Sequence, residues 1–361
     1  MELVIKVSTD YTENTIIAQF INPIGLKFNR ELVNSGSLSF QVSITDLQLA
    51  QVIEFKKVAL YAIDQGEDKP IWTGYISEIV NDFAWVYITC GDEKDFMRNK
   101  IISGSRDWMN VNLDTVLSSM VSEANQRKGT NELALSYLTD SPNLMVKKKF
   151  SYGVTFFDAI REITEALGLE WKVFLNKIIV KQSIGIDRSV ASPDYFEFVW
   201  NNQSPIENNI TKFKNTRSVN GIATWVIGKA SGGGVSVISG DKSLFGSIER
   251  VYTMDDGDVQ SQTQEYVNKH QTSQLEREFE VQIDAEEAIN VDVGDLVKIR
   301  IIHGSPLVDA DTAVKIIEKT AVFENKVPTI TIKVATETKE VKNMANFLTE
   351  LNRRLRRVEL Y

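Results

Sequence analysis

Ile71-Trp-Thr-Gly-Tyr-Ile-Ser-Glu-Ile-Val80 is an alternating, β-branched stretch between two similar ones, Phe55–Ile63 and Ala84–Cys90. A polar loop and a short turn separate the three stretches. This pattern predicts an antiparallel three-stranded meander with one face toward water. The same order recurs near the other end of the chain, in Leu296–Ile302, Ala313–Phe323 and Pro328–Val334. The repetition indicates that architecture, rather than a catalytic motif, organises this chain.

The region before the first meander is also predicted to be β structure. Leu3–Val7, Ile16–Phe20 and Ser37–Ile44 have the composition of strands. The apolar residues of the third stretch fall on one face: Leu38, Phe40, Val42 and Ile44. Because alternate residues of a strand point to opposite faces, this pattern favours a closed or sandwiched sheet.

The middle of the chain changes to a helical period. An amphipathic helix is predicted to begin after Asn112 and to end near Gly129. A second helix is predicted to begin after Thr155, which forms a capping-box-like start with Asp158. Gly168 stands where a left-handed terminator belongs, so we expect that helix to end there.

β structure is predicted again after the second helix. Leu169–Lys181 reads as a hairpin with its turn at Asn176–Lys177. Farther along, Asn209–Thr216 and Gly221–Ile227 are expected to pair with each other. Val259–Phe279 is predicted to be a polar helix with a thin apolar side.

These patterns predict a mainly β protein with an α+β insert, in which two similar antiparallel β-barrel domains flank an inserted α/β domain. The predicted domains are a first barrel at 1–104, the insert at 105–204, a second barrel at 205–338 and a C-terminal helix at 339–361. Strand order alone does not decide which strands close which barrel.

The C-terminal segment carries an unbroken a/d heptad series. Its apolar positions are Val341, Met344, Leu348, Leu351, Leu355 and Val358. Arg354 then falls at a g position and Glu359 at the following e position, where they could pair between parallel helices. We interpret these eight residues as an oligomer or partner interface. The alternative is an amphipathic helix that lies on its own domain.

Composition excludes several classes of protein. The chain has 361 residues, of which 49 are acidic and 40 basic, for a net charge of -9. An acidic protein repels nucleic acid, so duplex-DNA recognition is not expected. The single Cys90 excludes an intramolecular disulfide framework. No stretch approaches the roughly 20 apolar residues of a membrane span.

Catalytic and metal-binding signatures are missing from the sequence. His270 and His303 are the only two histidines, and no zinc-protease, paired-cysteine or nucleophile-elbow motif is present. Gly240-Asp-Lys-Ser243 lacks the spacing of a phosphate-binding loop. Asp255–Asp258 and Asp309–Asp311 lack the spacing of a calcium loop. We therefore expect no catalytic residue, metal or cofactor, and no enzymatic activity.

The order of these elements resembles the tail-tip or baseplate hub proteins of tailed bacteriophages and related contractile injection machines. The resemblance covers nearly the whole chain. It rests on the strand Ile71–Ile76 with its Trp-Thr-Gly, the helix and strand of Thr155–Trp171, Asn208-Asn-Ile210 and Val293-Gly-Asp-Leu-Val297.

The resemblance implies a structural virion protein of the tail tip, assembled in the bacterial host cytoplasm. A homotrimer would present six similar barrels to the six-fold tail tube, and would line or close the DNA exit channel. The implied partners are other copies of the chain, the tail tube or distal tail protein, a central fibre or spike protein and the tape measure protein. DNA would be only a passing cargo, and no stable membrane insertion is implied.

Other functions were considered beside the trimeric hub. A distal tail ring protein would be hexameric and would have less use for a duplicated barrel. A carbohydrate-binding tail-tip adhesin would need exposed aromatic platforms, for which Trp72, Trp85, Trp108 and Trp200 are the candidates. A tail-associated hydrolase would need a catalytic carboxylate pair, which nothing in the sequence selects.

Overall fold

The computed structural model divides the chain into two compact units. It describes residues 2–10, 15–62, 70–128, 134–218, 222–230, 232–243, 246–254, 259–270, 276–283, 291–304, 309–324 and 327–335. The larger unit comprises Met1–Phe213 with Glu280–Tyr361, and the smaller unit is Lys214–Phe279. The smaller unit is therefore an insertion in the chain of the larger one.

One sheet, with thirteen strands among the described residues, organises the larger unit. Its first strands are β1 (Leu3–Ser8), β2 (Ile16–Ile21), β3 (Ile24–Glu31), β4 (Ser37–Ser43), β5 (Lys57–Ala62), β6 (Trp72–Asn81) and β7 (Trp85–Asp92), with the 3-10 helix η2 (Leu47–Gln51) after β4. Its later strands are β13 (Glu197–Asn201), β14 (Ile210–Ser218), β18 (Glu276–Ile283), β19 (Leu296–Ile302), β20 (Ala310–Glu324) and β21 (Val327–Ala335), with η5 (Pro205–Glu207) before β14.

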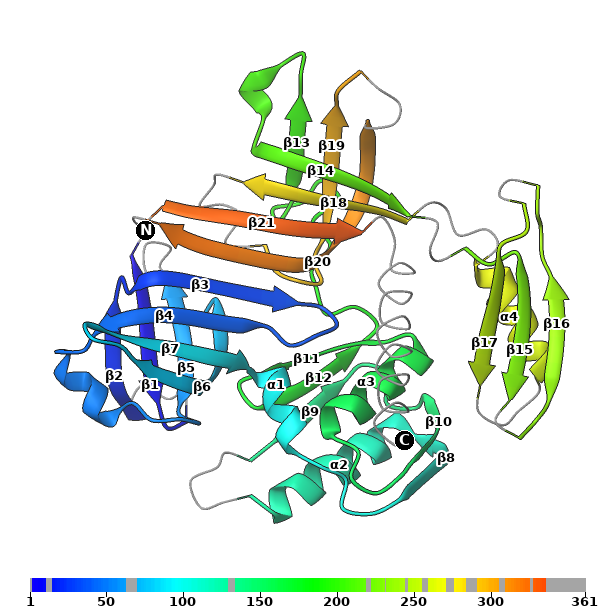
Figure 1. Cartoon of the computed structure of the whole chain (residues 1–361), viewed down its shortest axis with the longest axis horizontal. Helices are drawn as coiled ribbons and strands as arrows, with labels where there is room; N and C mark the ends of the chain where they lie inside the picture. The colour runs from blue at the N-terminus through cyan, green and yellow to red at the C-terminus, as the bar shows by residue number, and fades with distance from the viewer. Residues whose placement is uncertain are drawn as a thin grey trace. The chain divides into compact units, whose positions relative to one another are not determined.

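The hydrogen-bonded order is β14-β18-β21-β20-β3-β4-β7-β6-β5-β1-β2, and β19 and β13 branch from β20. Figure 1 shows the strands from β14 to β7 side by side. Both predicted meanders are confirmed, because β5, β6 and β7 pair antiparallel, as do β19, β20 and β21.

Strand β4 shows why this sequence folds as a sheet. Leu38, Phe40 and Val42 are buried, and the polar residues between them are partly exposed. Phe40 packs near Phe20 of β2, with ring centroids 5.8 Å apart. Ile44 lies beyond the end of the strand and is 46% exposed, so the predicted buried face ends at Val42.

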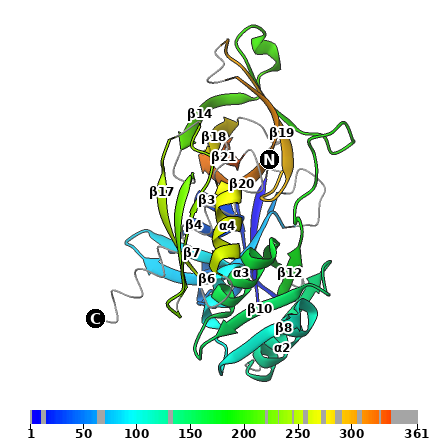
Figure 2. The same ribbon diagram turned by 90° about the vertical axis from the view of Figure 1, so that its right-hand side faces the viewer.

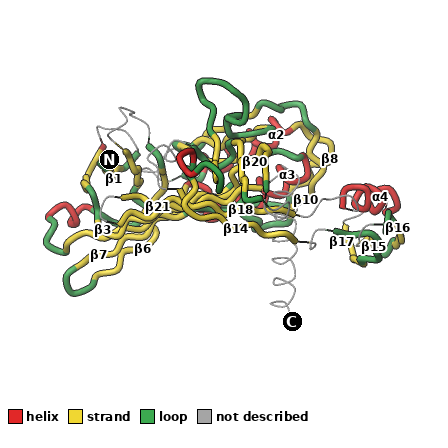
Figure 3. The backbone as a smooth tube through the Cα atoms, turned by 90° about the horizontal axis from the view of Figure 1, so that it is seen from above, coloured by secondary structure: helices red, strands yellow, loops and turns green. Residues whose placement is uncertain are grey.

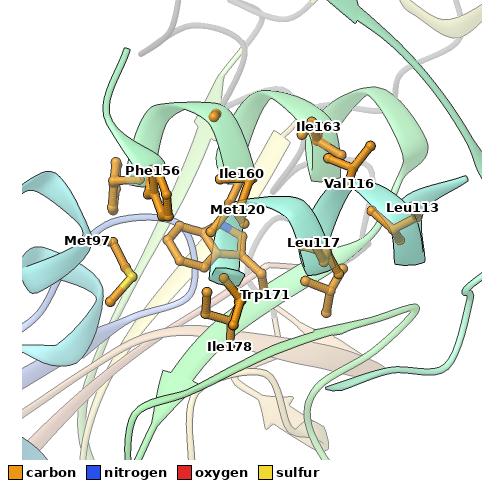
Figure 4. Packing of buried hydrophobic residues seen from close by; sticks show 14 of the residues in the cluster. Met97, Leu113, Val116, Leu117, Met120, Phe156, Ile160, Ile163, Trp171 and Ile178 are labelled. Carbon is orange, nitrogen blue, oxygen red and sulfur yellow. The ribbon is translucent and has the colours of Figure 1, made fainter. Parts of the chain in front are cut away.

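An α/β insert follows β7. Its elements are α1 (Glu93–Phe96), η4 (Met97–Asn99), β8 (Arg106–Asn112), α2 (Leu113–Gln126), β9 (Ser136–Thr139), β10 (Met145–Phe150), α3 (Phe156–Leu167), β11 (Glu170–Phe174) and β12 (Lys177–Lys181). Helices α2 and α3 share one core with the sheet β11-β12-β9. Figure 4 shows Trp171 among side chains of both helices, including Met120 and Ile160.

Helix α3 has the ends that its sequence predicts. The Thr155 side chain accepts a hydrogen bond from the Asp158 N–H at 3.1 Å and donates one to the Asp158 carboxylate at 2.8 Å. Gly168 adopts φ 70°, and the Leu169 N–H then donates to the Thr164 carbonyl.

Two local predictions need correction. Asn112 does precede α2, but its side chain makes no capping hydrogen bond, and the helix ends at Gln126; Gly129 lies outside the described residues. The hairpin turn lies at Leu175–Asn176, one residue earlier than predicted. Both turn residues have positive φ, of 49° and 59°, which a tight type I′ hairpin requires.

The smaller unit is a three-stranded sheet covered by one helix. It contains β15 (Trp225–Ala230), β16 (Val235–Ser239), β17 (Glu249–Met254) and α4 (Val259–His270). Helix α4 runs along the strands and covers one face (Figures 2 and 3). Gly228 permits this close packing, because a Cβ there would lie within van der Waals overlap of the Thr263 hydroxyl.

The smaller unit overturns one predicted pairing. β15 pairs with β16 and β17, whereas β14 pairs with β18, so Asn209–Thr216 and Gly221–Ile227 do not form a hairpin. The predicted helix after Val259 is present, but it ends at His270.

The fold class is confirmed as mainly β with an α+β insert. The described strands form open sheets, so the two predicted barrels are not closed. The four predicted domain ranges remain a prediction. The predicted helix at 339–361 lies outside the described residues.

Candidate assembly surface

The two halves of the large sheet repeat one strand order. The first half reads β3-β4-β7-β6-β5-β1, and the second reads β14-β18-β21-β20-β19-β13. One difference is that β1 runs antiparallel to β5, whereas β13 runs parallel to β19. The other is that a short loop joins β3 to β4, whereas β15, β16, β17 and α4 lie in the chain between β14 and β18. The duplication therefore extends well beyond the two meanders.

A β-bulge occurs at the same place in each half. Strand β6 shifts register against β7 between Ile76 and Glu78. Strand β20 shifts register against β21 between Ile316 and Glu318. Because a bulge adds one residue and bends its strand, both strands turn at matching points along the sheet. The residues after the bulges correspond one to one, with Asn81 of β6 matching Ala321 of β20.

The backbone beside each bulge is repeated as well. The Ile76 carbonyl accepts a hydrogen bond from the Phe55 N–H at 2.8 Å, and the Ile316 carbonyl accepts one from the Gly294 N–H at 2.9 Å. Both donors have positive φ, 63° for Phe55 and 97° for Gly294. The two halves thus share a turn with positive φ at the same position, which glycine adopts freely and which strains Phe55.

Strand pairing between β20 and β3 joins the two halves into one sheet. The pairing is antiparallel and runs from Glu318 opposite Glu31 to Val322 opposite Lys27. Beneath it, the ring of buried Phe28 stacks on Phe323 with centroids 6.2 Å apart. We call this contact the internal joint.

Strand β6 lacks the neighbour that β20 has in the internal joint. On the side away from β7, β6 pairs with β5 as far as Tyr75, and Ile76 bonds to the loop before β5. Among the described residues, Glu78–Asn81 have β7 on one side and no strand on the other. These residues correspond to the part of β20 that β3 covers. Glu78–Asn81 are therefore an open edge.

Two other edges of the sheet are covered by side chains. On β2, the Gln19 N–H donates to the Gln48 side chain at 2.7 Å, and that amide donates back to the Gln19 carbonyl at 3.0 Å. On β13, the Val199 N–H donates to the Asn209 side chain at 2.7 Å, and the Asn201 N–H donates to Asn208 at 2.6 Å. Such caps prevent strand addition. Asn208 and Asn209 belong to the motif that carried the resemblance.

Strand β14 is the second open edge. It stands at the end of the hydrogen-bonded order, with β18 as its single strand neighbour among the described residues. Lys212 and Lys214 on this strand are exposed. Glu78 and Asp82, at and beside the open edge of β6, are also exposed. One open edge is therefore acidic and the other basic.

Ion pairs fix the insert and the two halves of the sheet to one another. Arg30 of β3 donates to Asp292, which precedes β19, at 2.8 Å. Lys315 of β20, which is buried, pairs with Glu170 of β11, which is mostly buried. Although burial favours the neutral acid, Arg30 and nearby lysines hold the pKa of Asp292 below its ordinary value.

Two buried lysines lie in this junction. Lys94 of α1 donates to the Leu32 carbonyl at 2.6 Å, and Lys319 of β20 donates to the Val291 carbonyl at 2.6 Å. Burial lowers the pKa of each from 10.5 to about 8, against the opposing attraction of Asp92 for Lys94 and of Asp292 for Lys319. The junction is a structural polar core, because each ammonium is held by backbone carbonyls.

Comparisons with known proteins give structural likeness only. No family model matches the chain, and no curated protein sequence matches it. The 43 kDa tail protein of prophage MuSo2 from Shewanella oneidensis superimposes with a TM-score of 0.65 at 11% identity, over 94% of this chain and 99% of that one. The tail protein from Neisseria meningitidis MC58 gives a TM-score of 0.66 at 11% identity, over 94% and 98%.

A third solved structure comes from a secretion machine. The E. coli c3393 protein, a component of the type VI secretion system described as similar to T4 tail proteins gp27 and gp5, has a TM-score of 0.53. It is 9% identical, over 93% of this chain and 77% of that one. This chain has the fold of phage tail proteins. The resemblance predicted from its sequence is confirmed at the level of the fold.

The site predicted within the tail-protein fold was the heptad segment. Its eight residues lie outside the described residues, so that interface remains a prediction: Val341, Met344, Leu348, Leu351, Arg354, Leu355, Val358 and Glu359. Sequence reasoning missed both open edges, because the alternation of a strand is the same whether or not it has a neighbour.

The alternative sites weighed from the sequence rest on tryptophan side chains, metal ligands and a membrane span. Trp72 and Trp108 are buried, and Trp85 and Trp200 are only partly exposed, so none of these four offers an open platform for a sugar ring. Among the described residues, no group of three or more His, Cys, Asp or Glu side chains could hold a metal ion. No described helix is long and apolar enough to span a membrane.

Proposed function

We propose that this chain is a structural subunit of a phage tail tip or baseplate, and that it forms a homotrimeric hub. The observation that carries the proposal is the duplicated sheet, with its matched bulges and its internal joint. Three copies of a duplicated chain supply six similar halves. A six-fold tail tube can then be met by a three-fold hub, which is the geometry that a symmetry adapter needs.

In this proposal each half acts as one barrel-like segment of the ring wall. The hub joins the tail tube or distal tail protein to a central fibre or spike protein and lines or closes the DNA exit channel. The net charge of -9 supports this role, because an acidic wall lets DNA pass without binding it. The proposed role needs no cofactor and no catalysis, and its location is the virion tail tip.

A hexameric distal tail ring is the second candidate within the same particle. The duplicated sheet favours the trimer, because six copies would carry twelve halves. Among the described residues, the ordered pairing between β20 and β3 already supplies inside one chain a contact that a hexamer would have to make between chains.

The mass of the purified chain in solution tests this proposal. Light scattering should give a trimer at high concentration. A second version that ends before Val341 tests the heptads: a fall to monomer would assign trimerisation to them, and a surviving trimer would assign it to the sheet. A monomer at every concentration, or a stable hexamer, would contradict the trimeric hub.

A further inference from the structure

Strand β6 and strand β14 are the two positions at which the duplicated pattern is incomplete. In the internal joint, β3 covers the outer edge of β20. The counterpart of β20 in the other half is β6, and the counterpart of β3 is β14. Within the part of the chain that the structure describes, the outer edge of β6 is open and β14 ends the sheet. A second internal joint would therefore pair β6 with β14. In the strand order, β14 and β6 lie on opposite sides of the internal joint, and the described sheet does not pair them within one chain.

We propose that copies of this chain join head to tail, with Glu78–Asn81 of β6 in one copy pairing antiparallel with β14 of the next copy. This inference rests on the proposed trimer and adds to it the residues that join the copies. The occupant of each open edge is thus a second copy. A head-to-tail contact uses two different surfaces and closes into a ring when the rotation between copies allows it.

The backbone of β6 is oriented for this pairing. Ile76 directs its N–H and carbonyl toward the segment before β5, as Ile316 does toward the segment before β19. After the bulge, the alternation of an antiparallel ladder directs the N–H and carbonyl groups of Ile79 and Asn81 to the same side, away from β7. Their counterparts on β20 lie opposite Arg30 and Phe28 in the internal joint. The N–H and carbonyl groups of Ile79 and Asn81, which no described strand pairs, are therefore those that an added strand would use.

Charge on the two edges is complementary. Glu78 and Asp82 are exposed at the β6 edge, and Lys212 and Lys214 are exposed on β14. Opposite charges across an interface favour the correct register and disfavour pairing of two like edges. β6 pairing with β6, which would give a closed two-fold dimer, would bring the carboxylates together. Charge therefore favours the head-to-tail contact.

The other exposed edges of the sheet are poorer candidates. Gln48 covers β2, and Asn208 and Asn209 cover β13, as shown above. Neither β6 beyond Ile76 nor β14 contains a proline that would block pairing. The choice of edges thus follows from which backbone groups are already satisfied.

A proline substitution tests the contribution of β6. Asn81→Pro removes the outward N–H and fills its place with a ring, whereas Asn81→Val keeps the N–H and serves as the matched control. We expect Asn81→Pro to weaken the trimer at least about tenfold, which corresponds to about 1.4 kcal/mol. Asn81→Val should leave the trimer unchanged. If both variants and the wild type had the same trimer dissociation constant, the proposal would be overturned.

Cross-linking tests the pairing directly. Val80→Cys would be combined in turn with Thr211→Cys, Lys212→Cys or Phe213→Cys, and each doubly substituted chain mildly oxidised. One register should give covalently linked trimers, and the single variants should not. The native Cys90 is buried and stays out of the reaction. Gln19→Cys with Lys212→Cys is the control, because β2 is covered.

The outcomes separate this inference from the proposed function. A wild-type trimer without cross-links would overturn the β6–β14 contact and keep the hub. Cross-links within a hexamer or an open filament would support the contact and contradict the trimer. A chain that stays monomeric and uncross-linked at every concentration would overturn both.

Discussion

Strands β20 and β6 share one backbone plan but differ in what covers them. After the bulge, Lys319 and Ala321 of β20 are buried beneath the internal joint. The matching positions on β6 are Ile79, which is partly exposed, and Asn81, which is exposed. The two strands have the same hydrogen-bonding geometry. Their side chains differ in burial, because β3 covers β20 and no described strand covers the matching part of β6. The halves can therefore be compared position by position.

Breaking the internal joint should have the largest effect. Phe28 is 1% exposed and stacks on Phe323, so Phe28→Ala removes a large buried ring and should cost about 3–5 kcal/mol. Urea unfolding would measure the loss as a lower midpoint. The control is Phe83→Ala at the fully exposed tip of the β6–β7 hairpin, which should change stability by less than about 0.5 kcal/mol. Equal midpoints for both variants would show that the joint contributes little.

The buried pair between β20 and the insert should come next. Lys315→Ala leaves the mostly buried Glu170 carboxylate without its charged partner and should cost about 3 kcal/mol. Replacing both residues by Met removes the unpaired charge and should recover most of that loss. Urea midpoints of the wild type, the single variant and the double variant measure the loss and its recovery. A double variant no more stable than Lys315→Ala would argue against charge as the cause.

Stability should rise with pH through the range set by Lys319. Its folded pKa is about 8, against 10.5 for an exposed lysine, so between these values the unfolded chain binds more protons. The penalty for burying the charged lysine is full below pH 8 and is relieved as pH rises. Relief of up to about 3 kcal/mol is expected by pH 10.

Lys319→Met tests this assignment. Urea midpoints of the wild type and the variant would be measured at several pH values from 7 to 10. The midpoint should rise with pH less steeply in the variant, because the variant has no Lys319 to lose its proton. Arg30, Arg188, Asp292 and Asp295 face this lysine and remain in both proteins. If the midpoints of the two proteins changed with pH in parallel, Lys319 would not be the cause of the pH dependence of stability.

The sequence predicted the elements whose signals are local. Both meanders are runs of β-branched and apolar residues bounded by turn formers, and Thr155 and Gly168 mark the two ends of α3. Strand β3 was missed, because its bulge between Ile24 and Lys27 breaks the alternation. The β14–β18 pair was missed because the smaller unit separates two strands that are neighbours in space.

The candidate surface could not be predicted for a different reason. An open edge is defined by the absence of a neighbouring strand, and Glu78–Asn81 carry the same alternation as a covered strand. The strand order is needed to see that β3 covers the outer edge of β20, whereas no described strand covers the matching edge of β6. The caps formed by Gln48 and Asn209 are likewise long-range contacts.

The positive-φ turns of the two halves should respond differently to substitution. Gly294 has φ 97°, and an added Cβ would lie 3.0 Å from the Ile184 side chain, so Gly294→Ala should cost about 1–3 kcal/mol. Phe55→Gly relieves positive φ but loses the ring stacked on Tyr75 at 6.0 Å, so its net effect should stay within about 1 kcal/mol. Thermal unfolding would rank the two. A greater loss for Phe55→Gly would show that stacking outweighs backbone strain.

Salt should have the smallest effect and should distinguish the joint between copies from the internal one. Exposed charges are screened strongly between about 0.05 and 0.5 M salt, so the proposed contact of Glu78 and Asp82 with Lys212 and Lys214 should weaken by roughly threefold. The double variant Glu78→Gln with Asp82→Asn should form a weaker trimer at low salt and lose most of this dependence. The internal joint rests on buried rings, so the urea midpoint of the chain should respond far less. If the double variant kept the full salt dependence, the charges that govern association would lie elsewhere on the chain, and the acidic and basic edges would not meet.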